Sequence, residues 1–268
     1  MNFVIALQAE AHPLIKNLKL NKRTGKTPFP VFENRYHRIV ISGIGEIRSA
    51  AATGYLLGLF TAKPEAIINL GLAGHGSLKK GDIFIANRIF KESDKAVHYP
   101  PQLINLPFPR SSLQTCQSPC EHYSKDIGYD MEAHAFCSVA YQSCTREIVQ
   151  SIKVVSDNSS APLNSFDPKT ASNLIENQLD HIHMAIEGIE DLAKSLPTSP
   201  VKLKLIEKIK ATHHFSTTQS HQLESCIRHA CIFGFDQEKI EPILSSSSNS
   251  SEFIKRLKQA IEPLQIIS

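Results

Sequence analysis

The 268-residue sequence contains no tryptophan, and aromatic side chains make up only 7% of it. A platform of aromatic rings that stacks single-stranded nucleic acid is therefore not expected. The formal net charge is only +3, from 29 basic and 26 acidic residues. The chain thus lacks the strong basic excess that is typical of proteins binding nucleic acid or anionic membranes.

The sequence also lacks long apolar runs, since no stretch approaches the ~20 apolar residues that span a bilayer. Its first residues, MNFVIALQAEAHPL, have no basic start and no signal-type cleavage site. Six cysteines, at positions 116, 120, 137, 144, 226 and 231, form no C-x-x-C pair, so neither a zinc site nor a disulfide framework is expected. These absences predict a cytoplasmic protein with no membrane partner, no metal and no cofactor.

Apolar strand-like segments alternate with helix-like segments over the first 196 residues. This alternation predicts an α/β domain with a mixed, mainly parallel central sheet over residues 1–196. The expected strands are 2–7, 38–45, 65–74, 81–90 and 147–157, and the expected helices are 46–60, 131–144 and a single long one over 165–196.

The middle and the end of the chain differ from this pattern. Residues 93–128 hold five prolines and are predicted to be mainly loop, with one short strand at 111–116. The sequence PTSP at 197–200 predicts a domain boundary. Beyond it we expect a small helical appendage, 201–268, with helices at 201–212, 217–233, 237–244 and 252–264 and a flexible joint at 245–251.

Three acidic residues follow the predicted strands or begin a predicted helix. They are Glu10, Glu132 and Asp157. Each has a plain alternative: Glu10 as a solvated first-turn acid, Asp157 as a helix N-cap, and Glu132 as an acid that favours a helix N-terminus. Because ligands of open α/β sheets gather at the carboxyl ends of strands, we expect the three to meet at one rim.

Two glycine-rich turns lie beside these acids. GIGEIRSAAATG, residues 43–54, lacks the third glycine of a dinucleotide-binding fingerprint, and GLAGHG, residues 71–76, lacks the GK[ST] of a P-loop. Both predict tight turns at which backbone N–H groups approach a sugar or an anion closely.

The order of five segments, IALQAE, ISGIGEIRSAAAT, IINLGLAG…GDIFIA, YDMEAHAF and KVVSDNS, resembles the nucleoside phosphorylase superfamily. Within it, the closest likeness is to the methylthioadenosine/S-adenosylhomocysteine nucleosidases. The resemblance covers residues 1–196 except for a middle that is shortened between Phe90 and Asp130. It implies a three-layer nucleosidase-like domain, a homodimer, and hydrolysis of the N-glycosidic bond of a purine nucleoside, as in nucleoside catabolism.

The resemblance also implies roles for single residues. Asp157 would protonate the purine N7 and Glu10 would direct or deprotonate the attacking water, while Met131 and Glu132 would grip the ribose. Asp130 is expected to be a solvated acid at the helix start. Further substrate contacts are expected at Gly45, Leu72, Ala73, Gly74, Cys116, Gln117, Ser118, Lys153, Ser156 and Phe166.

Some positions depart from the family pattern and leave alternatives open. Leu72 stands where the family has a serine, and Lys153 where it has an arginine. A phosphate-dependent phosphorylase is one alternative, with Arg35 and Arg48 as candidate phosphate ligands, although the carboxylate of Glu10 would repel a phosphate dianion. A catalytically inert nucleoside-binding or scaffold protein is the other.

Overall fold

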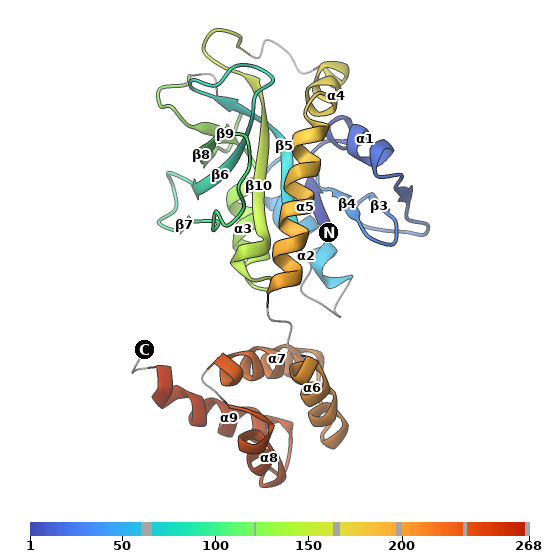
Figure 1. Ribbon diagram of the computed structural model, residues 1–268, viewed down its shortest axis with the longest axis vertical. Coiled ribbons are helices and arrows are strands. Elements are labelled where there is room, and N and C mark those ends of the chain that lie inside the picture. The colour runs from blue at the N-terminus through green and yellow to red at the C-terminus, as the bar shows by residue number, and fades with distance from the viewer. Residues whose placement is uncertain (60–65, 121, 163–166, 197–199, 233–234, 266–268) are drawn as a thin grey trace. The chain divides into compact units, whose positions relative to one another are not determined.

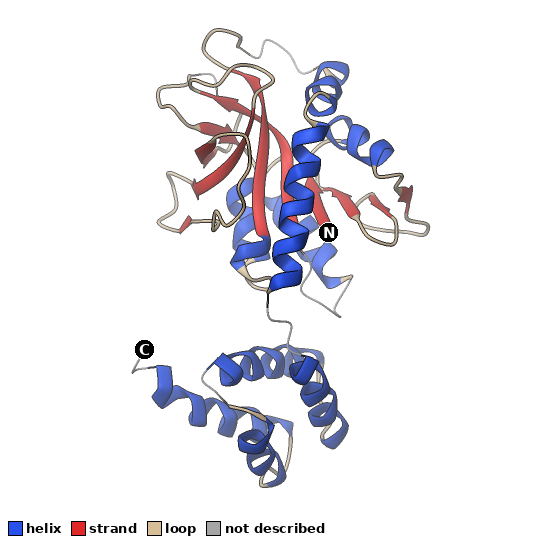
Figure 2. Ribbon diagram, in the orientation of Figure 1, coloured by secondary structure: helices blue, strands red, loops and turns tan. Residues whose placement is uncertain are grey.

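The computed structural model describes residues 1–59, 66–120, 122–162, 167–196, 200–232 and 235–265. The chain divides into two compact units, Met1–Leu196 and Pro197–Ser268 (Figures 1 and 2). The first unit contains a sheet covered by helices, and the second is helical.

Four parallel strands form the centre of the sheet. In spatial order they are β4 (Arg38–Ile41), β1 (Asn2–Ile5), β5 (Ile67–His75) and β10 (Val149–Asp157). Their side chains are almost all buried. This explains why they read as continuous apolar runs in the sequence, because a parallel sheet covered on both faces needs apolar residues at successive positions.

The sheet continues beyond β10 and closes on itself. β6 (Ile83–Phe90) pairs antiparallel with β10 and parallel with β8 (Arg110–Thr115). β8 in turn pairs with β9 (Gly128–Asp130), and β9 pairs antiparallel with the end of β5. Strands β5, β10, β6, β8 and β9 thus form a closed ring, which places the ends of β5, β9 and β10 next to one another.

The sheet is mixed, as predicted, but parallel pairing is limited to part of it. Four short strands had not been predicted: β2 (Asn21–Lys22), β3 (Val31–Glu33), β7 (Val97–His98) and β9. Each has an antiparallel partner, and β9 also pairs parallel with β8. Strands of two or three residues show no periodicity, so the sequence carried no signal for them.

Helices cover both faces of the sheet, which makes the unit a three-layer structure (Figure 2). On one face α1 (Gln8–Asn17), α4 (Pro168–Glu176) and α5 (Leu179–Ser195) contribute to one buried apolar cluster. On the other face α2 (Glu46–Gly58) and α3 (Ala133–Ala140) contribute to a second. The sheet supplies side chains to both clusters, as expected for buried strands.

The prediction of a single helix over 165–196 was wrong, because the chain forms α4 and α5 separately. Asp167 caps α4 by accepting hydrogen bonds from the backbone N–H groups of Lys169 and Thr170. The break falls after Asn177, where the Gln178 side chain donates a hydrogen bond of 2.7 Å to the carbonyl of Gly81. This contact with a distant loop could not be inferred from helical periodicity.

The segment between β6 and α3 contains β7, β8 and β9, and its described residues form no helix. The predicted strand at 111–116 corresponds to β8. The remaining stretches are loop, as the prolines indicated.

The second unit consists of α6 (Pro200–Thr212), α7 (Thr217–Ile232), α8 (Gln237–Ser245) and α9 (Ser250–Gln265). These helices share an apolar core of their own, which includes the fully buried Phe253. Helix α9 starts two residues earlier than predicted, so the joint before it is short. No helix in the described part of either unit is long and apolar enough to cross a bilayer.

We predict that Gly128→Ala destabilises the first unit. A Cβ atom at Gly128 would lie 2.5 Å from the ring of the buried Phe84 and 3.0 Å from Leu113, and overpacking of this kind costs about 1–3 kcal/mol. Gly58→Ala is the control, because it lies in α2 with open space around it and should be neutral or stabilising. Urea unfolding measures both, and equal stabilities for the two variants would contradict the described packing around β9.

Candidate active site

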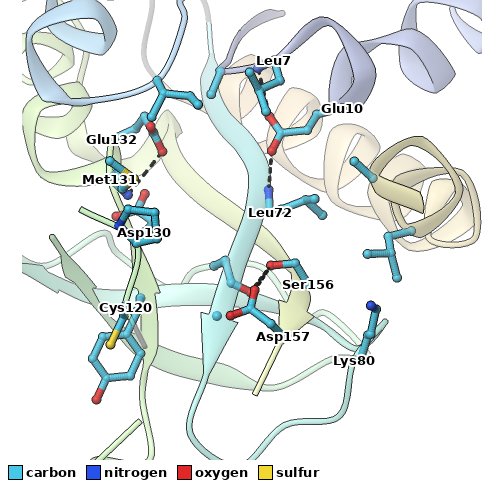
Figure 3. Close-up of a pocket in the computed structure, with 18 of the residues that line it drawn as sticks. Leu7, Glu10, Leu72, Lys80, Cys120, Asp130, Met131, Glu132, Ser156 and Asp157 are labelled. Carbon is cyan, nitrogen blue, oxygen red and sulfur yellow. Dashed lines mark hydrogen bonds between the residues drawn. The ribbon is translucent and has the colours of Figure 1, made fainter. Parts of the chain in front are cut away.

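A cleft of about 310 Å³ opens in the first unit where β1, β5 and β10 end (Figure 3). Its walls come from the starts of α1 and α3, from the ends of these strands, and from α4. The position agrees with the rule that α/β sheets bind ligands at the carboxyl ends of their strands. Its volume lies at the lower end of the range for small-molecule sites.

Eight of the residues proposed from the sequence line this cleft. They are Glu10, Leu72, Ala73, Gly74, Met131, Glu132, Ser156 and Asp157. The structure therefore brings the three acids together from segments that are far apart in the chain. Figure 3 shows Glu10 and Glu132 on opposite sides of β5, with Asp157 further along the strand.

The other six proposed residues comprise five that do not line the cleft and one that the structure does not describe. Gly45, Cys116, Gln117, Ser118 and Lys153 are not among the residues that line the cleft, and Phe166 lies outside the described residues. Pro119 and Cys120 line the cleft in place of the predicted 116–118 segment. Gly45 still contributes, because its backbone N–H donates a hydrogen bond to Glu132.

Glu10 lies just after β1, in the first turn of α1, and only 4% of its surface is exposed. Its carboxylate accepts hydrogen bonds of 3.1 Å from the backbone N–H groups of Leu7 and Leu72. Burial raises the pKa of Glu10 to about 7, although these two N–H donors and the charge of Lys153 oppose the shift. Glu10 is therefore not the solvated helix-start acid that the sequence had left as an alternative.

Glu132 occupies the N-cap position of α3, and its carboxylate lies on the side of the cleft opposite Glu10. Oε1 accepts a 2.8 Å hydrogen bond from the N–H of Gly45, and Oε2 accepts a 3.3 Å bond from the N–H of Met131. Gly45 has φ = +98°, a conformation that other residues rarely adopt. Burial, followed by the nearby charge of Asp130, raises the pKa of Glu132.

Asp157 ends β10, just after a shift in the pairing register with β5 between Val155 and Asp157. One carboxylate oxygen accepts a hydrogen bond from the hydroxyl of Ser156 and the other accepts one from the hydroxyl of Tyr123. Burial raises the pKa of Asp157, and the charge of Lys80 partly opposes this. The predicted alternative, a helix cap, does not apply because α4 is capped by Asp167.

The expectation that Asp130 is solvated was wrong. Its side chain is fully buried and lies 2.9 Å from the Nζ atom of Lys153, itself 2% exposed. Asp130 also accepts hydrogen bonds from the hydroxyl of Thr115, at 2.7 Å, and from the N–H of Ala133, at 2.8 Å. Strand β9 carries Asp130 into the sheet, which buries its carboxylate. The sequence held one signal of this pair: a lysine inside an apolar strand requires a buried anion.

The cleft also contains residues that the sequence had not suggested. Lys80, Cys120, Tyr123 and Thr170 are among the lining residues. No motif marks them, because they enter from loops and from α4. Among the described residues, no group of three or more His, Cys, Asp or Glu side chains is arranged to hold a metal ion.

Neither a protein-family profile nor a curated protein matches the sequence. Solved structures, in contrast, match the described fold. An Arabidopsis thaliana 5′-methylthioadenosine nucleosidase has a TM-score of 0.57 and 18% identity over 72% of this chain and 95% of its own. The chain shares the nucleosidase fold.

Two further structures agree with this assignment of the fold. The 5′-methylthioadenosine/S-adenosylhomocysteine nucleosidase of S. pneumoniae, solved with a transition-state inhibitor, has a TM-score of 0.57 and 16% identity over 70% of this chain and 98% of its own. The enzyme from Colwellia psychrerythraea, solved with adenine, has a TM-score of 0.54 and 16% identity over 70% and 93%. The resemblance predicted from the sequence is thus confirmed at the level of the fold.

Lys153→Met should destabilise the protein strongly, because it leaves the carboxylate of Asp130 buried without its cation. Breaking a buried ion pair costs about 3–5 kcal/mol. Adding Asp130→Asn should recover part of the loss, since no buried anion then remains at that position. Lys194→Met is the matched control: its pair with Asp191 is exposed, with 74% and 75% of the two side chains accessible, so its loss should change the stability little. Urea unfolding tests this, and equal losses for Lys153 and Lys194 would refute it.

The pKa of Glu10 predicts a pH-dependent loss of stability. Because the folded protein binds this proton more tightly than the unfolded chain, its contribution to stability falls as the pH rises from about 4.5 to about 7. The expected loss is up to about 3 kcal/mol. Glu10→Gln should remove this part of the pH dependence, whereas Glu187→Gln, at an exposed position of α5, should leave it unchanged. Urea unfolding at pH 5 and pH 8 gives the free energy of unfolding at each pH. An equal change in this free energy between the two pH values in wild type and Glu10→Gln would contradict the prediction.

Proposed function

We propose that the protein hydrolyses the N-glycosidic bond of a purine nucleoside. The observation that carries this proposal is that Glu10, Glu132 and Asp157 line one cleft, each in a different environment. The nucleosidase fold supports it, since the solved structures compared above are 5′-methylthioadenosine nucleosidases.

The reaction needs a proton donor at the base and a proton acceptor at the water. Cleavage of the bond from the ribose C1′ to the purine N9 leaves electrons on the base and positive charge on the sugar, as in glycoside hydrolysis. Asp157 gives its proton to the purine N7. A water molecule attacks C1′ and gives a proton to Glu10. The products are the free purine and the free sugar.

The environments of the two acids suit these roles. The pKa of Asp157 is raised by burial, which favours the protonated form that an acid catalyst needs. Glu10, with a pKa of about 7, is partly ionised at neutral pH and can act as a base there. Two backbone N–H groups hold its carboxylate in place, so little reorganisation is required.

Glu132 would bind the ribose on the opposite wall. Its two oxygens are held by the N–H groups of Gly45 and Met131, and a carboxylate can accept further hydrogen bonds from a diol. Part of the cleft wall, formed by Leu72, Ala171 and Leu174, is apolar. That wall would suit an apolar 5′ substituent such as a methylthio group.

A phosphorylase reaction is the less favoured alternative. A phosphate dianion requires cations, and neither Arg35 nor Arg48 lines the cleft. The Arg35 guanidinium lies over the ring of Tyr36, and Arg48 packs beside Gly43. Among the described lining residues the cation is Lys80, which lies near Asp157 rather than near Glu10.

An inert nucleoside-binding protein is a second candidate, and one observation favours it. The hydroxyl of Tyr123 bonds to Asp157, the residue that has to reach the base.

We also propose that the protein forms a homodimer. Ile44, at the mouth of the cleft, and Ile47, on α2, are 51% and 87% exposed, and exposed apolar side chains of this kind suit an interface between subunits.

We predict that the protein releases adenine from methylthioadenosine without phosphate. Glu132→Gln should reduce kcat/KM by about 10²- to 10⁴-fold, because the two hydrogen bonds from the ribose lose their charged acceptor and each is worth about 1.5–3 kcal/mol. Glu187→Gln, on the surface of α5, is the control and should leave the rate unchanged. Liquid chromatography of a panel of purine nucleosides, with and without phosphate, measures release.

Three outcomes would contradict the proposal. Release that requires phosphate would identify a phosphorylase. Absence of release from every nucleoside, together with a raised melting temperature for one of them, would identify an inert binder. An unchanged rate in Glu132→Gln would show that the cleft is not the site of the reaction.

A further inference from the structure

Tyr123 inserts its ring into the cleft from the segment between β8 and β9. The ring lies directly on Gly74 of β5: a Cβ atom there would meet the ring and its hydroxyl at 2.6–2.9 Å. Tyr129 packs against it edge-on, with ring centroids 5.4 Å apart. The absence of a side chain at Gly74 is thus what allows Tyr123 to reach this position.

The segment that carries Tyr123 is held against the same strand. The backbone N–H of Gly76 donates a 3.0 Å hydrogen bond to the carbonyl of Ile127. A Cβ atom at Gly76 would lie only 2.0 Å from the carbonyl oxygen of Lys125. Glycines 74 and 76 therefore make room for the chain itself, whereas the sequence had suggested close approach of a sugar or an anion.

The hydroxyl of Tyr123 donates to one oxygen of Asp157, and the hydroxyl of Ser156 donates to the other. A heterocycle that uses Asp157 must place a nitrogen within hydrogen-bond distance of this carboxylate. The phenol of Tyr123 already occupies the approach to one oxygen. Ser156 is the neighbouring residue on the same strand, so its bond is compatible with a ligand in the cleft, whereas that of Tyr123 is not.

We propose that Tyr123 is an internal ligand of Asp157, which a nitrogen heterocycle replaces when it binds. Tyr123 is thereby a specificity-determining residue, because the incoming base must place a nitrogen that hydrogen-bonds to Asp157 where the phenol was bound. This inference rests on the proposed function in one respect: it takes the ligand of Asp157 to be a purine-like base.

Adenine binding to the full-length protein tests the inference. Tyr123→Phe removes the hydroxyl and keeps the ring, so adenine no longer has to break a hydrogen bond to a carboxylate. We expect adenine to bind on the order of tenfold to a hundredfold more tightly, as loss of one such competing bond predicts. Tyr99→Phe is the matched control, because Tyr99 is 60% exposed and does not line the cleft; its affinity should equal that of wild type. Isothermal titration calorimetry gives the dissociation constants.

Fluorescence provides a second measurement, since the chain has six tyrosines and no tryptophan. Adenine should change the tyrosine emission of wild type when Tyr123 leaves the carboxylate, and it should not do so in Tyr123→Phe. Gly74→Ala should displace the ring and give the emission of the released tyrosine without adenine.

Equal adenine affinity in wild type and Tyr123→Phe would overturn the inference, as would failure of both to bind adenine. The proposed function is judged separately by adenine release from methylthioadenosine. If adenine binds with the expected difference but no nucleoside is cleaved, the inference stands and the hydrolase proposal fails. If nucleosides are cleaved and Tyr123→Phe binds adenine as wild type does, the reverse holds.

Discussion

The buried charge of Lys153 is the interaction on which the structure of the cleft depends. Its ammonium group lies 2.9 Å from Asp130, and this pair joins β10 to β9 just before α3 begins. The same charge lowers the pKa values of Glu10 and Glu132, although burial still leaves both raised. Without a cation beneath them, carboxylates this close together would be protonated more readily. The Lys153 side chain thus stabilises both the contact between β10 and β9 and the ionised forms of Glu10 and Glu132.

The closed ring of strands explains why acids from distant parts of the chain meet. β9 must pair with the end of β5 for Glu132 to face Glu10 across the cleft, and β10 must run beside β5 for Asp157 to lie further along. The three carboxylates then differ in their surroundings. Two backbone N–H groups hold each of Glu10 and Glu132, whereas side-chain hydroxyls bond to Asp157. Backbone donors are fixed, so they suit a carboxylate that must keep its position. Side-chain hydroxyl donors can rotate away, so they suit a carboxylate that exchanges one hydrogen-bond partner for a ligand.

The sequence predicted the parts of this fold that depend on local pattern. β5 and β10 are long apolar runs and were placed within two residues at either end. The sequence could not show which of two nearby acids, Asp130 or Glu132, pairs with Lys153, because that choice depends on how β9 enters the sheet. The break before α5 depends likewise on the contact between Gln178 and Gly81. Tyr123 carried no signal at all, since its place is set by the space over Gly74.

Residues that the sequence had not suggested surround Asp157. Glu10, Met131 and Glu132 line the cleft, and so do Tyr123 and Lys80, which the sequence had not suggested and which lie near Asp157. A hydroxyl that donates to a carboxylate favours its ionised form, whereas protonation of a base requires the neutral acid. Departure of Tyr123 would therefore do two things at once: it would free an oxygen of Asp157 for the heterocycle and favour the protonated form that acid catalysis needs. In the proposed reaction, binding of the base and protonation of Asp157 would therefore occur together, because both depend on the departure of the Tyr123 hydroxyl.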